Sequence, residues 1–152
     1  MKILRKPQAN AVIISVISIF YALVFILTSG HLEFERILNH ADTLNSAFWN
    51  EWSAFLKQGN MKYFGYAYIS IALAVVILSF IRKRDYDEYQ TGILGKGVMV
   101  MGTAMVCLFP IALLLVLSYP AYSVETLMFL VVAHWSIVLI AYLIYVIKWV
   151  KS

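Results

Sequence analysis

Four long apolar runs, separated by polar stretches, dominate the pattern of this chain. They cover residues 11 to 29, 63 to 81, 98 to 118 and 125 to 147. A helix rises about 1.5 Å per residue, so roughly 20 apolar residues cross the hydrocarbon core of a bilayer. A single segment in lipid can satisfy its backbone hydrogen bonds only as a helix. The pattern therefore predicts an all-α integral membrane protein, a four-transmembrane-helix bundle formed by one domain of residues 1 to 152.

Composition supports the membrane class and limits the chemistry. Hydrophobic residues make up 62% of the chain and charged residues 13%, whereas soluble proteins average about 45–50% and about 25%. A water-soluble fold would lack the polar side chains to cover its surface. The single cysteine, Cys107, excludes an intrachain disulfide and a cluster of metal-binding thiolates. We therefore expect the lipid bilayer as the surroundings, no cofactor, and no nucleic acid as a partner.

The basic residues are distributed unevenly between the two sides of the predicted bundle. If the N-terminus is cytoplasmic, the cytoplasmic side holds Lys2, Arg5, Lys6, Arg82, Lys83, Arg84, Lys96, Lys148 and Lys151, and the outer side holds Arg36, Lys57 and Lys62. Cytoplasmic loops of membrane proteins are enriched in lysine and arginine. The bias predicts cytoplasmic N and C termini, with residues 30 to 62 outside. Short loops and basic ends are typical of a multi-pass protein of a prokaryotic plasma membrane, and the first run is long for a cleaved signal peptide.

The outer segment, residues 30 to 62, has an amphipathic pattern. Placed on a helix, its apolar residues fall on one stripe: Phe34, Ile37, Leu38, Ala41, Leu44, Phe48, Trp52, Phe55 and Leu56. Neither glycine nor proline occurs between residues 31 and 58. The pattern predicts one long amphipathic helix, or two short ones with a break between Asp42 and Ser46, where Asp, Asn and Ser can cap a helix.

The charges of the outer segment limit what this stripe can contact. Helices that bind anionic lipid carry many lysines and arginines, but here the acidic residues outnumber the basic ones between residues 30 and 58. Three roles remain open: the stripe packs over the outer end of the bundle, lies passively in the headgroup layer, or docks a partner. We assign Phe48, Trp52 and Phe55 to this packing or partner surface.

The inner loop, residues 82 to 97, is predicted to contain a short helix. Asp85 or Asp87 can cap its start, and the glycine-rich stretch from 92 to 97 would loosen its end. The basic run at 82 to 84 could bind a phosphate or an anionic headgroup. The cytoplasmic position of the loop alone, however, explains a basic run there.

Few polar residues interrupt the four spans, and these are the candidate site residues. His134 lies nine residues into the fourth span, near the membrane centre. The side chains at a similar depth on the other spans are Tyr21, Ser70 and Cys107. A neutral His134 that donates to Tyr21, or to the Val106 carbonyl freed by Pro110, would be purely structural. As an ionisable group inside a membrane, His134 is also a candidate ligand-binding or functional residue.

The other two histidines do not support a metal centre. His31 and His40 lie in the outer segment, far along the chain from the middle of any span. They cannot join His134 around one ion at the membrane centre, and a haem with two histidine ligands would lack its second ligand within the subunit. We predict no metal site and no catalytic residue set.

Two pairs of small residues four positions apart would let helices approach each other closely. They are Ser18 with Ala22 and Ser70 with Ala74. Small residues at this spacing allow two backbones to pack tightly in a membrane. Such pairs are frequent in apolar helices, so they favour a close contact without locating it.

Three functions of different classes remain open. The first is a non-enzymatic accessory or assembly subunit that binds copies of itself or another membrane protein, because catalytic spacing is lacking and the outer stripe offers a surface. The second is a small-molecule transporter or channel built as an oligomer, which would need a polar path that the spans provide only sparsely. The third is an intramembrane enzyme or redox protein that uses His134 with Tyr21 or Cys107. We favour the first, and expect that the protein is not an enzyme.

Overall fold

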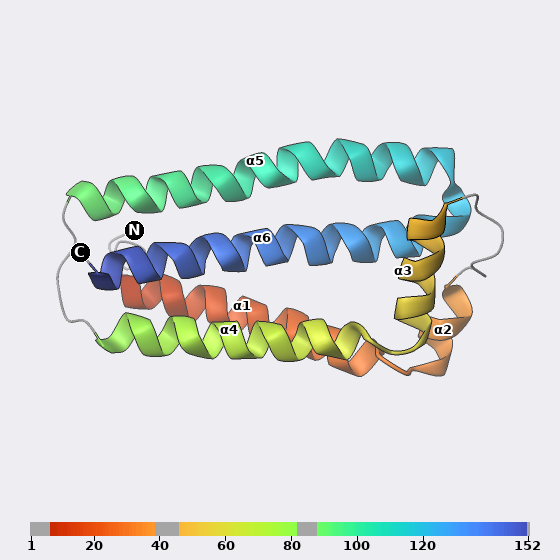
Figure 1. Cartoon of the computed structure of the whole chain (residues 1–152), viewed down its shortest axis with the longest axis horizontal. Helices are drawn as coiled ribbons and strands as arrows, with labels where there is room; N and C mark the ends of the chain where they lie inside the picture. The colour runs from red at the N-terminus through yellow and green to blue at the C-terminus, as the bar shows by residue number, and fades with distance from the viewer. Residues whose placement is uncertain (1–6, 39–45, 82–87, 152) are drawn as a thin grey trace.

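Four long helices lie side by side in the computed structural model, which describes residues 7–38, 46–81 and 88–151 (Figure 1). In chain order the helices are α1 (Pro7–Thr28), α2 (Leu32–Ile37), α3 (Ala47–Lys57), α4 (Met61–Ile81), α5 (Glu88–Ser118), the 3-10 helix η3 (Pro120–Tyr122) and α6 (Ser123–Lys151). The described residues contain helices and no strand, which confirms the predicted all-α class. α1 begins and α6 ends at one end of the bundle, and α2 and α3 lie at the opposite end (Figure 1).

Each long helix holds a stretch that is long and apolar enough to cross a membrane. These stretches are Gln8–Thr28, Met61–Ile81, Lys96–Ser118 and Pro120–Val150. Each one overlaps a predicted run, so the prediction of four long apolar helices is confirmed. A bundle of such helices satisfies its backbone hydrogen bonds internally, as a lipid environment requires. The fold is therefore consistent with a multi-pass membrane protein.

The structure differs from the predicted inner loop, because α5 is one continuous helix. It begins at Glu88 and passes through Gly92 and Gly97 to Ser118 without a break. A glycine inside a helix costs about 1 kcal/mol relative to alanine, which a long helix can tolerate. A Cβ added at Gly92 or Gly97 would meet no atom within 4 Å, so neither glycine is required by a close contact. The predicted cap, Asp85 or Asp87, lies outside the described residues.

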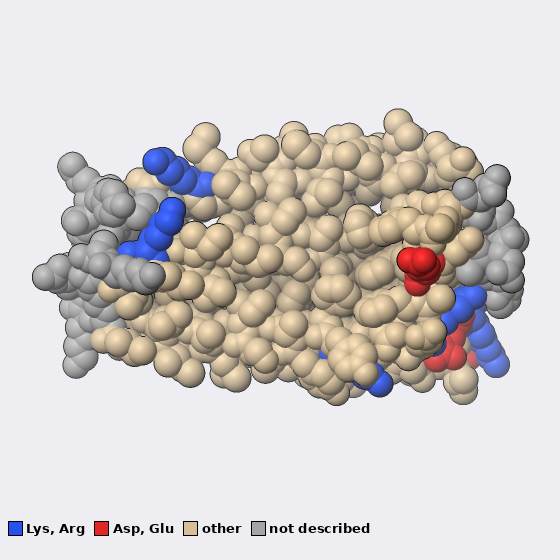
Figure 2. Space-filling model, viewed as in Figure 1, with Lys and Arg blue, Asp and Glu red and all other residues tan. Residues whose placement is uncertain are grey.

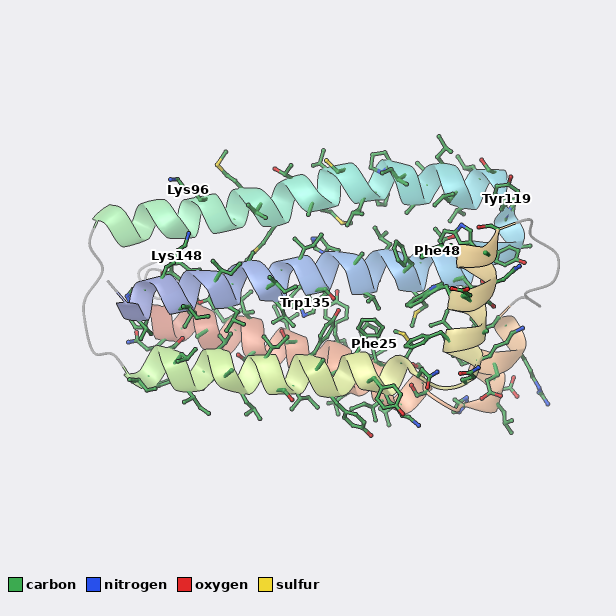
Figure 3. All side chains as sticks on the ribbon, in the orientation of Figure 1. Phe25, Phe48, Lys96, Tyr119, Trp135 and Lys148 are labelled. Atoms are coloured by element: carbon green, nitrogen blue, oxygen red, sulfur yellow. The ribbon has the colours of Figure 1, made fainter. Side chains whose placement is uncertain are left out.

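α1, α4 and α6 form the core of the bundle, and α5 lies beside α6. α1 packs along α4, α6 packs against both, and α5 packs mainly against α6 and η3. The buried apolar side chains of the three long core helices include Ala11, Ala22, Phe25, Tyr68, Ala72, Val75, Trp135, Val138, Leu139, Tyr142, Tyr145 and Val146. Figure 3 shows Phe25 and Trp135 between α6 and the pair formed by α1 and α4.

A close approach of α1 and α4 depends on Gly65. A Cβ at this position would lie 2.7 Å from Cγ1 of Ile26 and 2.9 Å from the carbonyl oxygen of Ala22, both too short for a real contact. Ser18 and Ala22, one of the predicted small pairs, are fully buried. Ser70, from the second pair, is exposed. Small residues on both helices therefore permit this contact.

The predicted outer segment forms two short helices, the second of the two arrangements that the sequence left open. α2 ends at Ile37 and α3 begins at Ala47. Ser46 occupies the N-cap position of α3, without a hydrogen bond from its side chain. The rest of the predicted break, within residues 39–45, lies outside the described residues.

Two glycine turns join these short helices to the long ones. Gly30 follows α1 with φ +76°, and Gly59 follows α3 with φ +67°, a backbone conformation that favours glycine. A Cβ on Gly59 would lie 3.1 Å from the backbone nitrogen of Gly30. The two turns therefore touch, which fixes the start of α2 beside the end of α3.

The apolar stripe packs over this end of the bundle. Leu38 and Leu56 are fully buried, and they belong to the main core cluster. The partly buried stripe residues packed against that cluster are Phe34, Trp52 and Phe55. Phe48 remains half-exposed and Ile37 is exposed, and Ala41 and Leu44 lie outside the described residues. Of the three roles left open for the stripe, packing is the one that these contacts support, and partner binding stays a prediction.

Candidate functional site

Buried hydrogen bonds join α1 to both of its neighbours in the core. Oγ of Ser15 on α1 donates to the carbonyl of Ala72 on α4, at 3.1 Å. Nε1 of Trp135 on α6 donates to Oγ of Ser18 on α1, also at 3.1 Å. The hydroxyl of Ser18 donates in turn to the carbonyl of Ile14, at 2.6 Å. The Ser18 hydroxyl thus accepts a hydrogen bond from α6 and donates one to the backbone of its own helix, α1.

Tyr68 joins α4 to α6. Its hydroxyl donates to the carbonyl of Val132 at 3.0 Å and lies 2.9 Å from Oγ of Ser136. The tyrosine has one hydroxyl proton, so Ser136 is the donor in the second bond. Tyr68 is buried, and its ring lies 5.7 Å from that of Phe25. Each pair of core helices is therefore connected by at least one side-chain hydrogen bond, in surroundings where an unmade bond is costly.

The four side chains predicted as ligand or polar-network candidates do not come together. His134 is half-buried and forms no hydrogen bond to the Val106 carbonyl or to any other described residue. Tyr21 packs its ring against Trp135, with centroids 4.7 Å apart. The Ser70 hydroxyl is exposed and donates to the carbonyl of Tyr66, at 2.9 Å. Cys107 is exposed on α5.

Equal predicted depth along the four apolar runs does not place side chains on faces that meet. One step along a helix turns the side chain by about 100°, so the next two residues after His134, Trp135 and Ser136, make the contacts that His134 does not. A signal for the core face was present in the sequence. Ala11, Ser15, Ser18 and Ala22 are small and recur every three or four residues, and all four are buried.

A second polar site joins α3 to the start of α6. Glu125 lies in the first turn of α6 and is fully buried. Oγ of Ser53 donates to Oε1 of Glu125 at 3.1 Å, and Nε1 of Trp52 donates to the Glu125 backbone carbonyl at 3.0 Å. A carboxylate in the first helical turn is also favoured by the helix dipole. Glu125 therefore helps to hold α3 against the start of α6. The sequence pattern does not reveal this pair, because Ser53 precedes Glu125 by 72 residues.

An aromatic cluster surrounds this junction. The rings of Trp52 and Phe55 are stacked, with centroids 5.5 Å apart. Trp52 also meets the edges of Phe64, at 6.4 Å, and Phe129, at 5.7 Å. Phe48 makes an edge contact with Phe129 at 5.3 Å, although half of its surface is exposed. Such edge-to-face pairs add to the burial that holds α3 in place.

On the face that Figure 2 shows, the described charged side chains lie towards the two ends of the bundle. The acidic residues whose side chains are described are Glu33, Glu35, Glu51 and Glu125, from α2, α3 and the first turn of α6. Lys96 of α5 and Lys148 of α6 lie at the opposite end (Figure 3). No group of three or more histidine, cysteine, aspartate or glutamate side chains that could hold a metal ion is found among the described residues.

The fold defines a class, a small helical bundle with four helices that are each long and apolar enough to cross a membrane. No family model, curated protein or solved structure matches the chain.

Proposed function

We propose that this protein is a non-enzymatic membrane subunit that assembles, through α5, with copies of itself or with another membrane protein. One observation carries the proposal. No residue in the membrane-crossing window of α5 is buried inside the protein, against 28% in α1, 28% in α4 and 33% in α6. Of the four long helices, α5 is therefore the one least buried against the rest of the protein. Most of its surface is open to another helix.

The side chains on α5 suit contact with a second helix. Met99 and Val106 are each 72% exposed, and Gly102 lies three residues after the first and four before the second, on the same face. A Cβ at Gly102 would meet no atom within 4 Å. Lipid tails are as apolar as leucine, so helices associate in a membrane by close packing around small residues. Gly102 supplies such a position between two large exposed side chains.

A proposal for topology accompanies this function. The excess of lysine and arginine on the side of the termini favours cytoplasmic N and C termini in a prokaryotic plasma membrane, with α2 and α3 outside. In intact cells, and in a Cys107→Ser background, a membrane-impermeant maleimide should label Gln58→Cys and leave Ser152→Cys unlabelled. Labelling of Ser152→Cys alone would reverse the orientation.

The single cysteine of the chain provides the test of assembly. Cys107 is exposed on α5, so a benzophenone maleimide attached there reacts on illumination with whatever lies against this helix in the native membrane. A matched control carries Cys107→Ser and Leu73→Cys, which moves the label to a 53% exposed position on α4. Adducts are separated by mass and identified from their peptides.

We expect the label at Cys107 to yield one discrete protein adduct, formed with a second copy or with one other membrane protein. The label at position 73 should react mainly with lipid. Lipid adducts alone at both positions, or the same protein adducts at both, would contradict assembly through α5.

A further inference from the structure

Lys96 and Lys148 form a pair of cations on neighbouring helices. Lys96 is the first residue of the apolar stretch of α5, and Lys148 lies near the last residue of the apolar stretch of α6. α5 packs along α6, and Figure 3 places both lysines at the end of the bundle where α6 ends. Both side chains are exposed. They are therefore at the level where the apolar stretches of two packed helices stop.

None of the acidic residues whose side chains are described lies at the end of the bundle that holds this pair. In Figure 2 blue side chains over α5 and α6 lie at this end, and the red side chains lie at the other end. The described acidic side chains belong to α2, α3 and the first turn of α6. Two like charges on adjacent helices repel each other, and α5 is held mainly by α6. An anion between the two ammonium groups would replace that repulsion with attraction to both helices.

The position of the pair indicates which anion this is. A lysine at the end of a membrane-crossing stretch lays its methylene chain along apolar surface and extends its ammonium group to the headgroup layer. Phosphate groups of lipids occupy that layer, and lysine is a common phosphate ligand in proteins. Anionic lipids are attracted by basic residues at this level.

We propose that Lys96 and Lys148 together bind the phosphate group of one anionic phospholipid at the seam between α5 and α6, and that this lipid holds α5 against α6. The proposal requires that the four helices cross a bilayer, but not that α5 binds another protein. The experiment below therefore tests it independently of the assembly proposed above.

Lys62 supplies a matched control. It lies on α4 beside the short helices, at the opposite end from the pair, and its Nζ lies 5.6 Å from the ring centroid of Tyr63. Lys62→Gln removes the same charge as Lys96→Gln or Lys148→Gln. A general loss of attraction for anionic lipid would thus appear in all three variants, whereas loss of a shared phosphate site would appear in two.

The experiment measures lipid binding to the full-length protein by native mass spectrometry. The delipidated protein is titrated with phosphatidylglycerol and, in parallel, with phosphatidylcholine. For the wild type we expect one phosphatidylglycerol that binds more tightly than the others and than phosphatidylcholine. Lys96→Gln and Lys148→Gln should each weaken that first site about fivefold or more, the factor expected for one basic residue at an anionic surface. Lys62→Gln should leave it unchanged, and Lys96→Arg should retain it.

A second measurement tests whether the bound lipid holds α5 against α6. Added phosphatidylglycerol should raise the melting temperature of the wild type, and should not raise that of the Lys96→Gln, Lys148→Gln double variant. The effects of the two single substitutions on this stabilisation by lipid should also be non-additive, because they remove two ligands of one phosphate. Equal binding of both lipids, or equal weakening by Lys62→Gln, would overturn the proposal.

Discussion

The three core helices and α5 are similarly apolar but are held in different ways. α1, α4 and α6 are joined in pairs by hydrogen bonds from Ser15, Tyr68 and Trp135, and α1 meets α4 closely at Gly65. None of the side chains from Lys96 to Ser118 on α5 makes a hydrogen bond to another helix. Because lipid competes with any apolar surface, polar bonds and small residues specify which helices pair in a membrane. The core is therefore specified from within the chain, and α5 remains open to other contacts.

The largest expected effect comes from adding one methyl group where α1 and α4 meet. Gly65→Ala puts a Cβ within 2.7 Å of Ile26 and 2.9 Å of a backbone oxygen, so the helices must separate. We expect it to lower the free energy of unfolding by about 1–3 kcal/mol, the usual cost of overpacking. Gly102→Ala on α5, where the methyl group meets nothing, should be neutral or stabilising by up to about 1 kcal/mol. Reversible unfolding in mixed micelles measures both, and equal losses would mean that α5 is packed as tightly as the core.

The junction at Glu125 should rank next. Glu125→Ala removes the acceptor of the Ser53 hydroxyl from a fully buried site. We expect a loss of about 1–2 kcal/mol, because a buried hydroxyl loses this acceptor, and faster proteolysis within α3. Glu51→Ala, on the exposed side of α3, should change neither quantity. If α3 is cleaved at the wild-type rate in Glu125→Ala, the Glu125 side chain does not hold α3 against α6.

A smaller loss should follow removal of one hydroxyl from the core. Tyr68→Phe deletes the bonds to Val132 and Ser136 while keeping the ring. Bonds between membrane helices contribute about 0.6 kcal/mol on average and up to about 1.7 kcal/mol. Tyr66→Phe, 52% exposed on the same helix, serves as the control. A double-mutant cycle with Ser136→Ala should give a coupling energy above zero, and full additivity would exclude the bond between the two hydroxyls.

His134 should have the smallest effect of the buried polar positions. It is half-buried and its side chain has no hydrogen bond among the described residues, so His134→Ala should change the free energy of unfolding by less than about 0.5 kcal/mol. Trp135→Ala, one position further along, removes a buried ring and the bond to Ser18, and should cost several times more. A loss in His134→Ala as large as that in Trp135→Ala would restore His134 as a core polar residue.

The sequence was sufficient to predict the long helices but not to predict which of their faces are in contact. The length and polarity of each run determine whether a helix can cross a bilayer, and those are properties of consecutive residues. Which face of a helix meets a neighbour depends on two segments of the chain. In an apolar helix, the face towards lipid and the face towards protein have similar residue compositions. The sequence therefore singled out His134, while its neighbours Trp135 and Ser136 form the network. The Ser53 and Glu125 pair depends on a chain reversal that no local pattern encodes.

The central claim, that α5 is the surface through which the protein assembles, is tested most directly by native mass spectrometry of complexes extracted gently from native membranes. Two variants are compared with the wild type: Val106→Trp on α5, at a position 72% exposed, and Ile77→Trp on α4, at a position 60% exposed. We predict that the wild type and Ile77→Trp retain a stoichiometric second subunit, either another copy or one other protein, and that Val106→Trp loses it. A monomeric wild type, or a complex that survives Val106→Trp intact, would contradict the claim.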